Sequence, residues 1–284
     1  MKKIPVNGVD LAVYEWSDSG EPVIFLHFMN GAACVWNGVV PFFTETYRAI
    51  GIDLRGHGHS DAPESGYEIA TMAADVIGVM DALGIESAHF VGSSLGCHVS
   101  AWLAAHYPER ARSLALSDGA IYDMAQPQGE PVALETILQM VAGNSIEPEF
   151  ATTDEFVQVL RDHWGEKWNA VRERAVFDGF VPALVQLPNG KFGRKTTKAL
   201  EVKMISELYQ VRHLPLYEKM QCPVLFLPAA KHRAFAYKNE FIARCRAVLK
   251  PYSKVVIIPN TEHNMLYDFP AEVSREVLAF YEEV

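Results

Sequence analysis

Residues 92–96, Gly-Ser-Ser-Leu-Gly, have the residue types and the spacing of a nucleophile turn, GxSxG. The apolar run SAHFVG (87–92) precedes them, and the helical stretch 95–107 follows. In such a strand-turn-helix setting, the flanking glycines let the strand and the helix approach closely, and the central Ser94 is held out at the turn. Ser94 is therefore the predicted nucleophile, and Ser93 is the weaker candidate. The alternative is a Gly-rich turn without chemistry.

Short apolar, β-branched runs recur along the chain and alternate with helix-length amphipathic stretches. This pattern is typical of a parallel sheet covered by helices. Most of the runs lack polar alternation, as strands buried on both faces do. The predicted strands are 11–16, 22–28, 47–53, 87–92, 112–118, 223–228 and 254–259, and the predicted helices are 68–83, 95–107, 237–249 and 271–283.

The alternation breaks between residues 120 and 220. Helical patterns dominate there, at 131–142, 153–163, 165–177 and 197–209, with no convincing run of strands. A helical insertion at this point would cover the carboxyl ends of the strands, where open α/β folds bind ligands. We expect a core formed by residues 1–119 and 221–284, and a mostly helical cap, or lid, at 120–220.

Four segments, in this order along the chain, resemble the α/β-hydrolase family. They are IFLHFMNG (24–31), DLRGHGHSDAP (53–63), VGSSLGC (91–97) and IPNTEHNMLYDFPAEV (258–273). The resemblance spans nearly the whole chain and points to the lidded, serine-nucleophile branch of the family. It implies an α/β fold with a mostly parallel central sheet flanked by helices and a helical cap inserted between strands 6 and 7.

The resemblance places the general base at His263, after the last strand run and before the final helix. Chain order agrees, because the histidine of this fold follows the serine and the acid. His263 would take the hydroxyl proton of Ser94 and return it to the leaving group.

Two backbone N–H groups are candidates for an oxyanion hole. Leu95 starts the predicted helix, where the helix dipole favours developing negative charge. The resemblance places the second donor at the backbone of Met29. Phe28 stands where the family usually has glycine, which could tilt this loop or narrow the pocket, and the Asn30 side chain is an alternative donor.

The stretch FLPAAKHRAF (226–235) holds no carboxylate, although the family's usual acid aligns with His232. A second histidine cannot stabilise an imidazolium at position 263, because its own charge would oppose it. A known variation of the fold moves the acid to the end of the preceding strand, where Asp118 stands. Asp118 is the predicted acid and Asp123 the reserve, although an Asp at such a place can also be a turn residue. Asp268 is expected to cap the last helix.

Composition narrows the classes of partner. The formal net charge of -10 argues against nucleic acid, because phosphate binding draws on clustered Lys and Arg. The N-terminal residues lack a signal-peptide pattern, and no run approaches the ~20 apolar residues of a membrane span. The four scattered cysteines predict free thiols in a reducing compartment. We expect a cytoplasmic protein without a membrane anchor, a metal or a cofactor; a homo-oligomer is compatible with the sequence.

The leading interpretation is a serine hydrolase that cleaves an ester, thioester, lactone or similar acyl bond through a Ser94–His263–Asp118 triad and an acyl-enzyme. Aromatic residues in the cap indicate an apolar or aromatic small-molecule substrate. Carbon–carbon bond hydrolysis and perhydrolysis use the same residues and stay open. So does a ligand-binding or signalling protein of the same fold with slow or no turnover.

Overall fold

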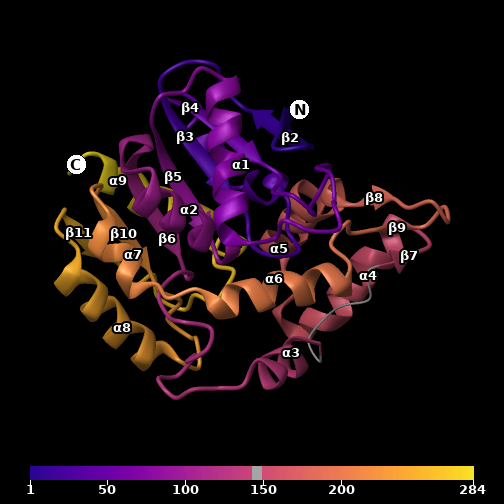
Figure 1. Cartoon of the computed structure of the whole chain (residues 1–284). Coiled ribbons are helices and arrows are strands. Elements are labelled where there is room, and N and C mark those ends of the chain that lie inside the picture. Colours follow the sequence, from indigo (N-terminus) through magenta and orange to yellow (C-terminus); the bar gives the residue numbers. More distant parts are fainter. Residues whose placement is uncertain (143–148) are drawn as a thin grey trace.

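The computed structural model, which describes residues 1–142 and 149–284, is built on an eight-stranded sheet with the order β1-β2-β4-β3-β5-β6-β10-β11 (Figure 1). The first two pairings in this order are antiparallel and the other five are parallel. The strands are β1 (Lys2–Val6), β2 (Val9–Glu15), β3 (Glu21–Leu26), β4 (Tyr47–Ile52), β5 (Ala88–Ser93), β6 (Ala111–Ser117), β10 (Val224–Leu227) and β11 (Ser253–Val255). The predicted fold class, a mostly parallel sheet flanked by helices, is confirmed.

Helices cover both faces of the sheet, which explains why the strands are apolar throughout. In β3, Val23 and Phe25 belong to one buried cluster, whereas Ile24 and Leu26 belong to the other. Successive side chains of a strand point to opposite faces, so neither face of β3 meets water. The cluster of Ile24 and Leu26 also contains buried residues of four core helices, α1 (Ile69–Ala82), α2 (Leu95–His106), α7 (Leu214–Lys219) and α8 (Phe235–Val248). The cluster of Val23 and Phe25 contains those of α9 (Pro270–Tyr281).

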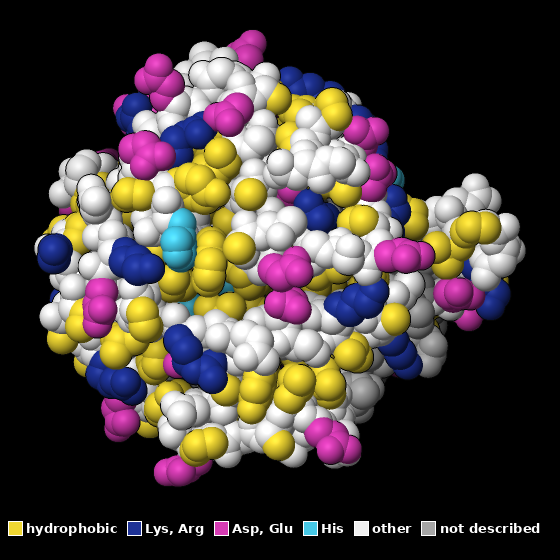
Figure 2. Space-filling model, viewed as in Figure 1, with side chains coloured by type: hydrophobic (Ala, Val, Ile, Leu, Met, Phe, Trp, Pro, Cys, Tyr) yellow, Lys and Arg dark blue, Asp and Glu magenta, His cyan; other side chains and the backbone are white. Residues whose placement is uncertain are grey.

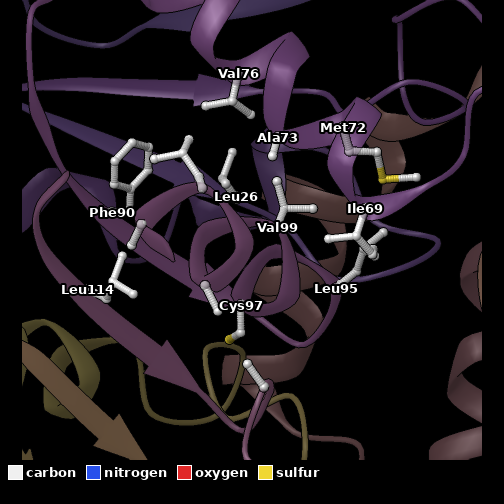
Figure 3. Close-up of a cluster of buried hydrophobic side chains, with 14 of the residues drawn as sticks. Leu26, Ile69, Met72, Ala73, Val76, Phe90, Leu95, Cys97, Val99 and Leu114 are labelled. Atoms are coloured by element: carbon white, nitrogen blue, oxygen red, sulfur yellow. The ribbon is translucent and has the colours of Figure 1, made fainter. Parts of the chain in front are cut away.

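One buried cluster joins the centre of the sheet to two of the helices on that face, α1 and α2 (Figure 3). Leu26, Phe90 and Leu114 come from three neighbouring strands. They meet Val76 of α1 and Val99 of α2, and all five side chains are fully buried. Since each buried aliphatic or aromatic side chain contributes on the order of 1.5–3 kcal/mol, this packing fixes the start of α2 against the end of β5.

All seven predicted strands are present, although β11 is shorter than the expected 254–259. The sequence reading missed β1. In β1 only Ile4 and Val6 are buried, and the strand pairs with β2 alone. Pro5 is acceptable at such an edge, where a strand needs fewer N–H donors, but in a sequence it counts against a strand.

The chain between β6 and β10 carries a helical insertion, drawn in rose and orange on the lower right of Figure 1. Contrary to the expectation of no strands, it also holds a small antiparallel sheet with the order β7-β9-β8. Its strands have two residues each, too short for a period to be read from sequence. The helices are α3 (Leu134–Ala142), α4 (Thr153–Trp164), α5 (Ala170–Ala175) and α6 (Lys198–Gln210), and the strands are β7 (Glu149–Phe150), β8 (Val185–Gln186) and β9 (Phe192–Gly193).

Charged side chains of both signs are scattered over the face shown in Figure 2, without a continuous basic patch. None of the helices within the described ranges combines the length and apolarity that crossing a bilayer requires. All four cysteines are buried free thiols, as predicted.

The turn between β5 and α2 depends on close backbone contact. A Cβ atom built at Gly96 would lie 2.0 Å from the carbonyl oxygen of Leu26 in β3, and one built at Gly92 would lie 2.7 Å from the backbone nitrogen of Cys97. Both neighbours are backbone atoms and cannot rotate away. Glycine is therefore required at both ends of this turn for steric reasons.

We expect Gly96→Ala to lower the free energy of unfolding by about 3 kcal/mol, since the added methyl forces β3 and α2 apart. Gly38→Ala is the matched control, because its Cβ would meet only Pro270 at 3.4 Å; it should change stability by less than about 0.5 kcal/mol. Urea denaturation measures both. Equal stability of the two variants would contradict the steric argument.

Candidate active site

Ser94 stands at the turn between β5 and α2 in a strained conformation, with φ 47° and ψ −107°. Its backbone N–H donates to the carbonyl of Ser117, 3.1 Å away, and this bond ties the turn to β6. The Ser94 side chain is partly exposed, whereas Ser93 is fully buried. A strained non-glycine residue that presents a hydroxyl is typical of a nucleophile turn.

The hydroxyl of Ser94 lies in a hydrogen-bonded chain with His263 and Asp118. Its Oγ is 3.0 Å from Nε2 of His263, and Nδ1 of the same ring is 2.6 Å from Oδ2 of Asp118. A carboxylate only accepts, so Nδ1 carries the proton and Nε2 is free to accept the serine proton. The structure thus brings the three predicted residues together from the carboxyl ends of β5, β6 and β11.

The Asp118 carboxylate is fully buried, and three donors surround it. Oδ1 accepts the backbone N–H of Ala229 at 3.0 Å, while Oδ2 accepts both His263 and the ammonium of Lys238, the latter at 2.8 Å. Burial alone would raise the pKa of Asp118, but the hydrogen bond and charge of His263, together with Lys238 and the Ala229 N–H, lower it to about 2. The group is therefore a carboxylate throughout the physiological pH range.

Sequence reasoning missed Lys238, although a signal for it exists. With Phe241, Ile242 and Cys245 it forms the buried set of α8, at helical spacing. A lysine within an apolar stripe indicates a buried partner of opposite charge, because lysine is almost never fully buried unless it is paired.

The other candidate acids are engaged elsewhere. Asp123 accepts hydrogen bonds from the backbone and the ring of His213, at 2.9 and 3.1 Å. Asp268 forms a two-bond ion pair with Arg172, at 2.7 and 2.6 Å. The expectation that Asp268 caps the last helix is wrong, since Phe269 is the N-cap of α9 and no side chain bonds there.

His232 lies beside His263 without bonding to it. Its ring centre is 6.2 Å from that of His263, and its Nδ1 accepts the backbone N–H of Ala234. Burial, and then the charge of Lys238, lower the pKa of His232 to about 4. His232 is therefore neutral at neutral pH and adds no charge to the site.

The loop after β3 holds the backbone of Met29 beside the site. Buried His27 fixes this loop, because Nδ1 donates to the Phe28 carbonyl at 2.8 Å and Nε2 accepts the Leu54 N–H at 3.0 Å. Within the described ranges, the Met29 N–H has no hydrogen-bond acceptor. The Asn30 side chain donates to Glu201 of α6, so this amide links the loop to the insertion.

Leu95 is the first residue of α2. Its N–H has no acceptor inside the helix, because the first four N–H groups of any helix lack one. Within the part of the chain that the structure describes, this N–H has no other acceptor either, so it is an available donor one residue after Ser94.

A cavity of about 310 Å³ opens onto His263 between the core and the insertion. Phe28 packs within it against Tyr267 and Phe180, with ring centres 5.6 and 6.2 Å apart. The ring thus forms a wall of the cavity. The lining residues are Phe28, Met29, Asn30, Leu160, His163, Trp164, Arg172, Phe180, Arg194, Glu262, His263, Asn264, Tyr267 and Asp268.

A second cavity, of about 500 Å³, lies between α5 and the segment at residues 34–42. It shares Tyr267 with the first but reaches neither Ser94, His263 nor Asp118. Of these two cavities, the smaller one is lined by His263, the hydrogen-bond partner of Ser94.

Asp118, His232 and His263 offer donor atoms within 4.8 Å of one another. The Asp118 oxygens already accept three hydrogen bonds, and the Lys238 ammonium beside them repels a cation. We assign no metal site to this cluster, and the described residues contain no other group of this kind.

Comparison with known proteins gives one family and several relatives. The model of the alpha/beta hydrolase fold matches residues 21–270. The chain is 26% identical to 2-(acetamidomethylene)succinate hydrolase of Mesorhizobium japonicum, over 97% of this chain and 91% of that protein. It is 32% identical to 3-oxoadipate enol-lactonase 2 of Acinetobacter baylyi, over 44% of this chain and 45% of that protein.

A solved structure, that of E-2-(acetamidomethylene)succinate hydrolase, superimposes with a TM-score of 0.81. The match covers 99% of this chain and 98% of that one, at 23% identity. At this identity the likeness establishes the fold alone.

We expect Asp118→Asn to lower kcat for a short p-nitrophenyl ester by a factor on the order of 10⁴, as when a serine protease triad loses its carboxylate. Asn tolerates the positive φ of position 118, 50°, so the backbone should hold. Asp123→Asn is the matched control and should keep activity within a few-fold. The reverse ranking in a spectrophotometric assay would move the acid to Asp123.

Proposed function

This chain belongs to the alpha/beta hydrolase fold family and is a hydrolase, and from that membership we propose that Ser94 attacks the acyl bond of a small-molecule substrate. The observation that carries the proposal is the continuous chain of hydrogen bonds from Ser94 Oγ through His263 to Asp118, at 3.0 and 2.6 Å. Both distances lie within the reach that proton transfer requires.

In the first half-reaction, Nε2 of His263 removes the hydroxyl proton while Ser94 Oγ bonds to the substrate carbonyl carbon. The imidazolium that forms is stabilised by the Asp118 carboxylate. The carbonyl oxygen becomes an oxyanion and accepts the N–H groups of Leu95 and Met29. Such prearranged donors contribute about 2.7–4 kcal/mol each in comparable sites.

His263 then gives its proton to the leaving group, and the carbon–leaving-group bond breaks, which leaves an acyl-enzyme on Ser94 and completes the first half-reaction. In the second half-reaction, His263 takes a proton from water, whose oxygen attacks the acyl carbon. His263 then returns this proton to Ser94 Oγ as the bond between Oγ and the acyl carbon breaks, which releases the acid and the free serine. Esters, thioesters and lactones all fit this sequence.

The insertion between β6 and β10 would act as the cap of the site, the role we assign to residues 120–220. Leu160, Trp164 and Phe180 of the insertion line the cavity together with Phe28 and Tyr267 of the core, and the Trp164 and Phe180 rings contact that of Tyr267. A helical cap there keeps bulk water from the acyl-enzyme and gives the site an apolar wall.

We further propose that the substrate joins an apolar part to an anionic group. Two arginines, Arg172 and Arg194, line the cavity, and guanidinium groups suit the recognition of a carboxylate. Arg172 is paired with Asp268, which raises its pKa, whereas burial lowers the pKa of Arg194 and the charge of Glu201 opposes that effect. Succinate and 3-oxoadipate, in the names of the two relatives, are both dicarboxylates.

Ser94→Ala should abolish both ester hydrolysis and labelling by a fluorophosphonate probe, because the covalent bond forms on its hydroxyl. Ser93→Ala, which alters a buried hydroxyl, is the matched control and should still be labelled. Mass spectrometry of the labelled peptide locates the adduct. A wild-type protein that is folded but neither labelled nor active would identify a binding protein instead.

Arg194→Met should lower kcat/KM for mono-p-nitrophenyl succinate by about 10- to 100-fold, the loss of one charge-assisted hydrogen bond. The neutral p-nitrophenyl butyrate should be hydrolysed at the wild-type rate. Arg174→Met, at a side chain 84% exposed, is the control and should change neither rate. An equal loss for both esters would remove Arg194 from substrate recognition.

A further inference from the structure

Lys238 is a buried cation in direct contact with the proposed catalytic acid. Its side chain is 1% exposed, its Nζ lies 2.8 Å from Oδ2 of Asp118, and that carboxylate is 0% exposed. The same oxygen accepts Nδ1 of His263 at 2.6 Å. The ammonium of Lys238 and the ring of His263 thus share one acceptor atom, Oδ2 of Asp118.

Packing gives the ammonium little room to move. Lys238 lies in the first turn of α8, and its Nζ is 5.1 Å from the ring centre of Tyr122. Burial lowers the pKa of Lys238, and the charge of Asp118 opposes that effect. We take Lys238 as an ammonium at neutral pH, because without its proton the buried Asp118 would lose a paired charge.

Four of the other titratable groups around Asp118 and His263 are neutral near pH 7, whereas Glu262, which lines the cavity beside His263, is a carboxylate whose pKa is lowered by its hydrogen bond with Lys167. Burial lowers the pKa of His98 well below its usual value and that of His232 to about 4. Burial also raises the pKa of Tyr122 to about 12 and that of Cys97 above it. Arg233, on the loop after β10, is a further cation that acts on this cluster, and among the described residues Lys238 is the lysine in contact with the carboxylate.

We propose that Lys238 is a positioning residue of the Ser94–His263–Asp118 chain: it fixes the Asp118 carboxylate and, by sharing its Oδ2, lowers the pH at which His263 takes up a proton. The inference rests on the proposed function of these three residues. It adds a fourth member that never touches the substrate.

The sign of the effect follows from simple electrostatics. The positive charge of Lys238 is linked to the imidazole of His263 by two successive hydrogen bonds through Asp118 Oδ2. That charge disfavours a second positive charge on the imidazole. The Lys238 ammonium also offsets part of the negative charge of Asp118, which weakens the attraction between this carboxylate and a protonated His263. Both effects keep the base neutral, and therefore competent, to a lower pH than Asp118 alone would allow.

Lys238→Met should move the acid limb of the pH profile of kcat/KM upward by about one pH unit. Lys238→Arg keeps the charge and should leave the limb near the wild-type position. Lys250→Met, which removes an exposed charge beyond the end of α8, controls for the change in net charge and should cause no shift. A folded Lys238→Met protein with an unmoved acid limb would overturn the proposal.

Lys238→Gln provides a second test, because it keeps a hydrogen-bond donor but no charge. It should shift the acid limb as Lys238→Met does; a wild-type limb in this variant would show that the hydrogen bond, and not the charge, matters, and would overturn the electrostatic role. Thermal unfolding establishes that each variant is folded.

An NMR titration of the His263 ring nitrogens, in the Ser94→Ala background, separates this inference from the proposed function. The signal is assigned by its loss in His263→Gln. The midpoint should rise by about one unit on adding Lys238→Met, whether or not the enzyme turns over any ester. Inactive wild-type protein would refute the proposed function alone, and an unmoved midpoint would refute the role of Lys238 alone.

Discussion

The site is organised around one buried charge, the carboxylate of Asp118. An ion removed from water costs several kcal/mol unless it is paired and hydrogen-bonded. Three separate parts of the chain supply the compensation: the backbone of Ala229, the ring of His263 and the ammonium of Lys238. The loop after β10, the histidine loop and α8 are therefore all held to the end of β6.

A parallel sheet is what allows these parts to meet. Strands β5, β6 and β10 are neighbours, and Ser93 pairs with Ser117, which pairs with Leu227. The residues just after these pairs emerge at the same edge. The strained turn places Ser94, the proposed nucleophile, at that edge. The packing of α2 on β3, which the glycines permit, offsets the strain.

The sequence was sufficient for the core strands and helices because their apolar runs and periods reflect burial on two faces. It could not predict β1, where edge position permits a proline, nor the two-residue strands of the insertion. The sequence did identify Ser94, His263 and Asp118, whose side chains the structure joins in one chain of hydrogen bonds. It missed Lys238 because the meaning of a buried lysine depends on a partner 120 residues away.

The neighbouring strands also explain how the fold tolerates a histidine where the family's usual acid aligns. Leu227 of β10 lies beside Ser117 of β6, so a carboxylate placed after either strand starts from nearly the same point. If Asp118 is the acid, as we propose, the loop after β10 contributes a donor instead, the backbone N–H of Ala229, which bonds to the carboxylate. His232 then stays neutral in that loop, because the negative charge beside His263 comes from Asp118, at the end of the adjacent strand.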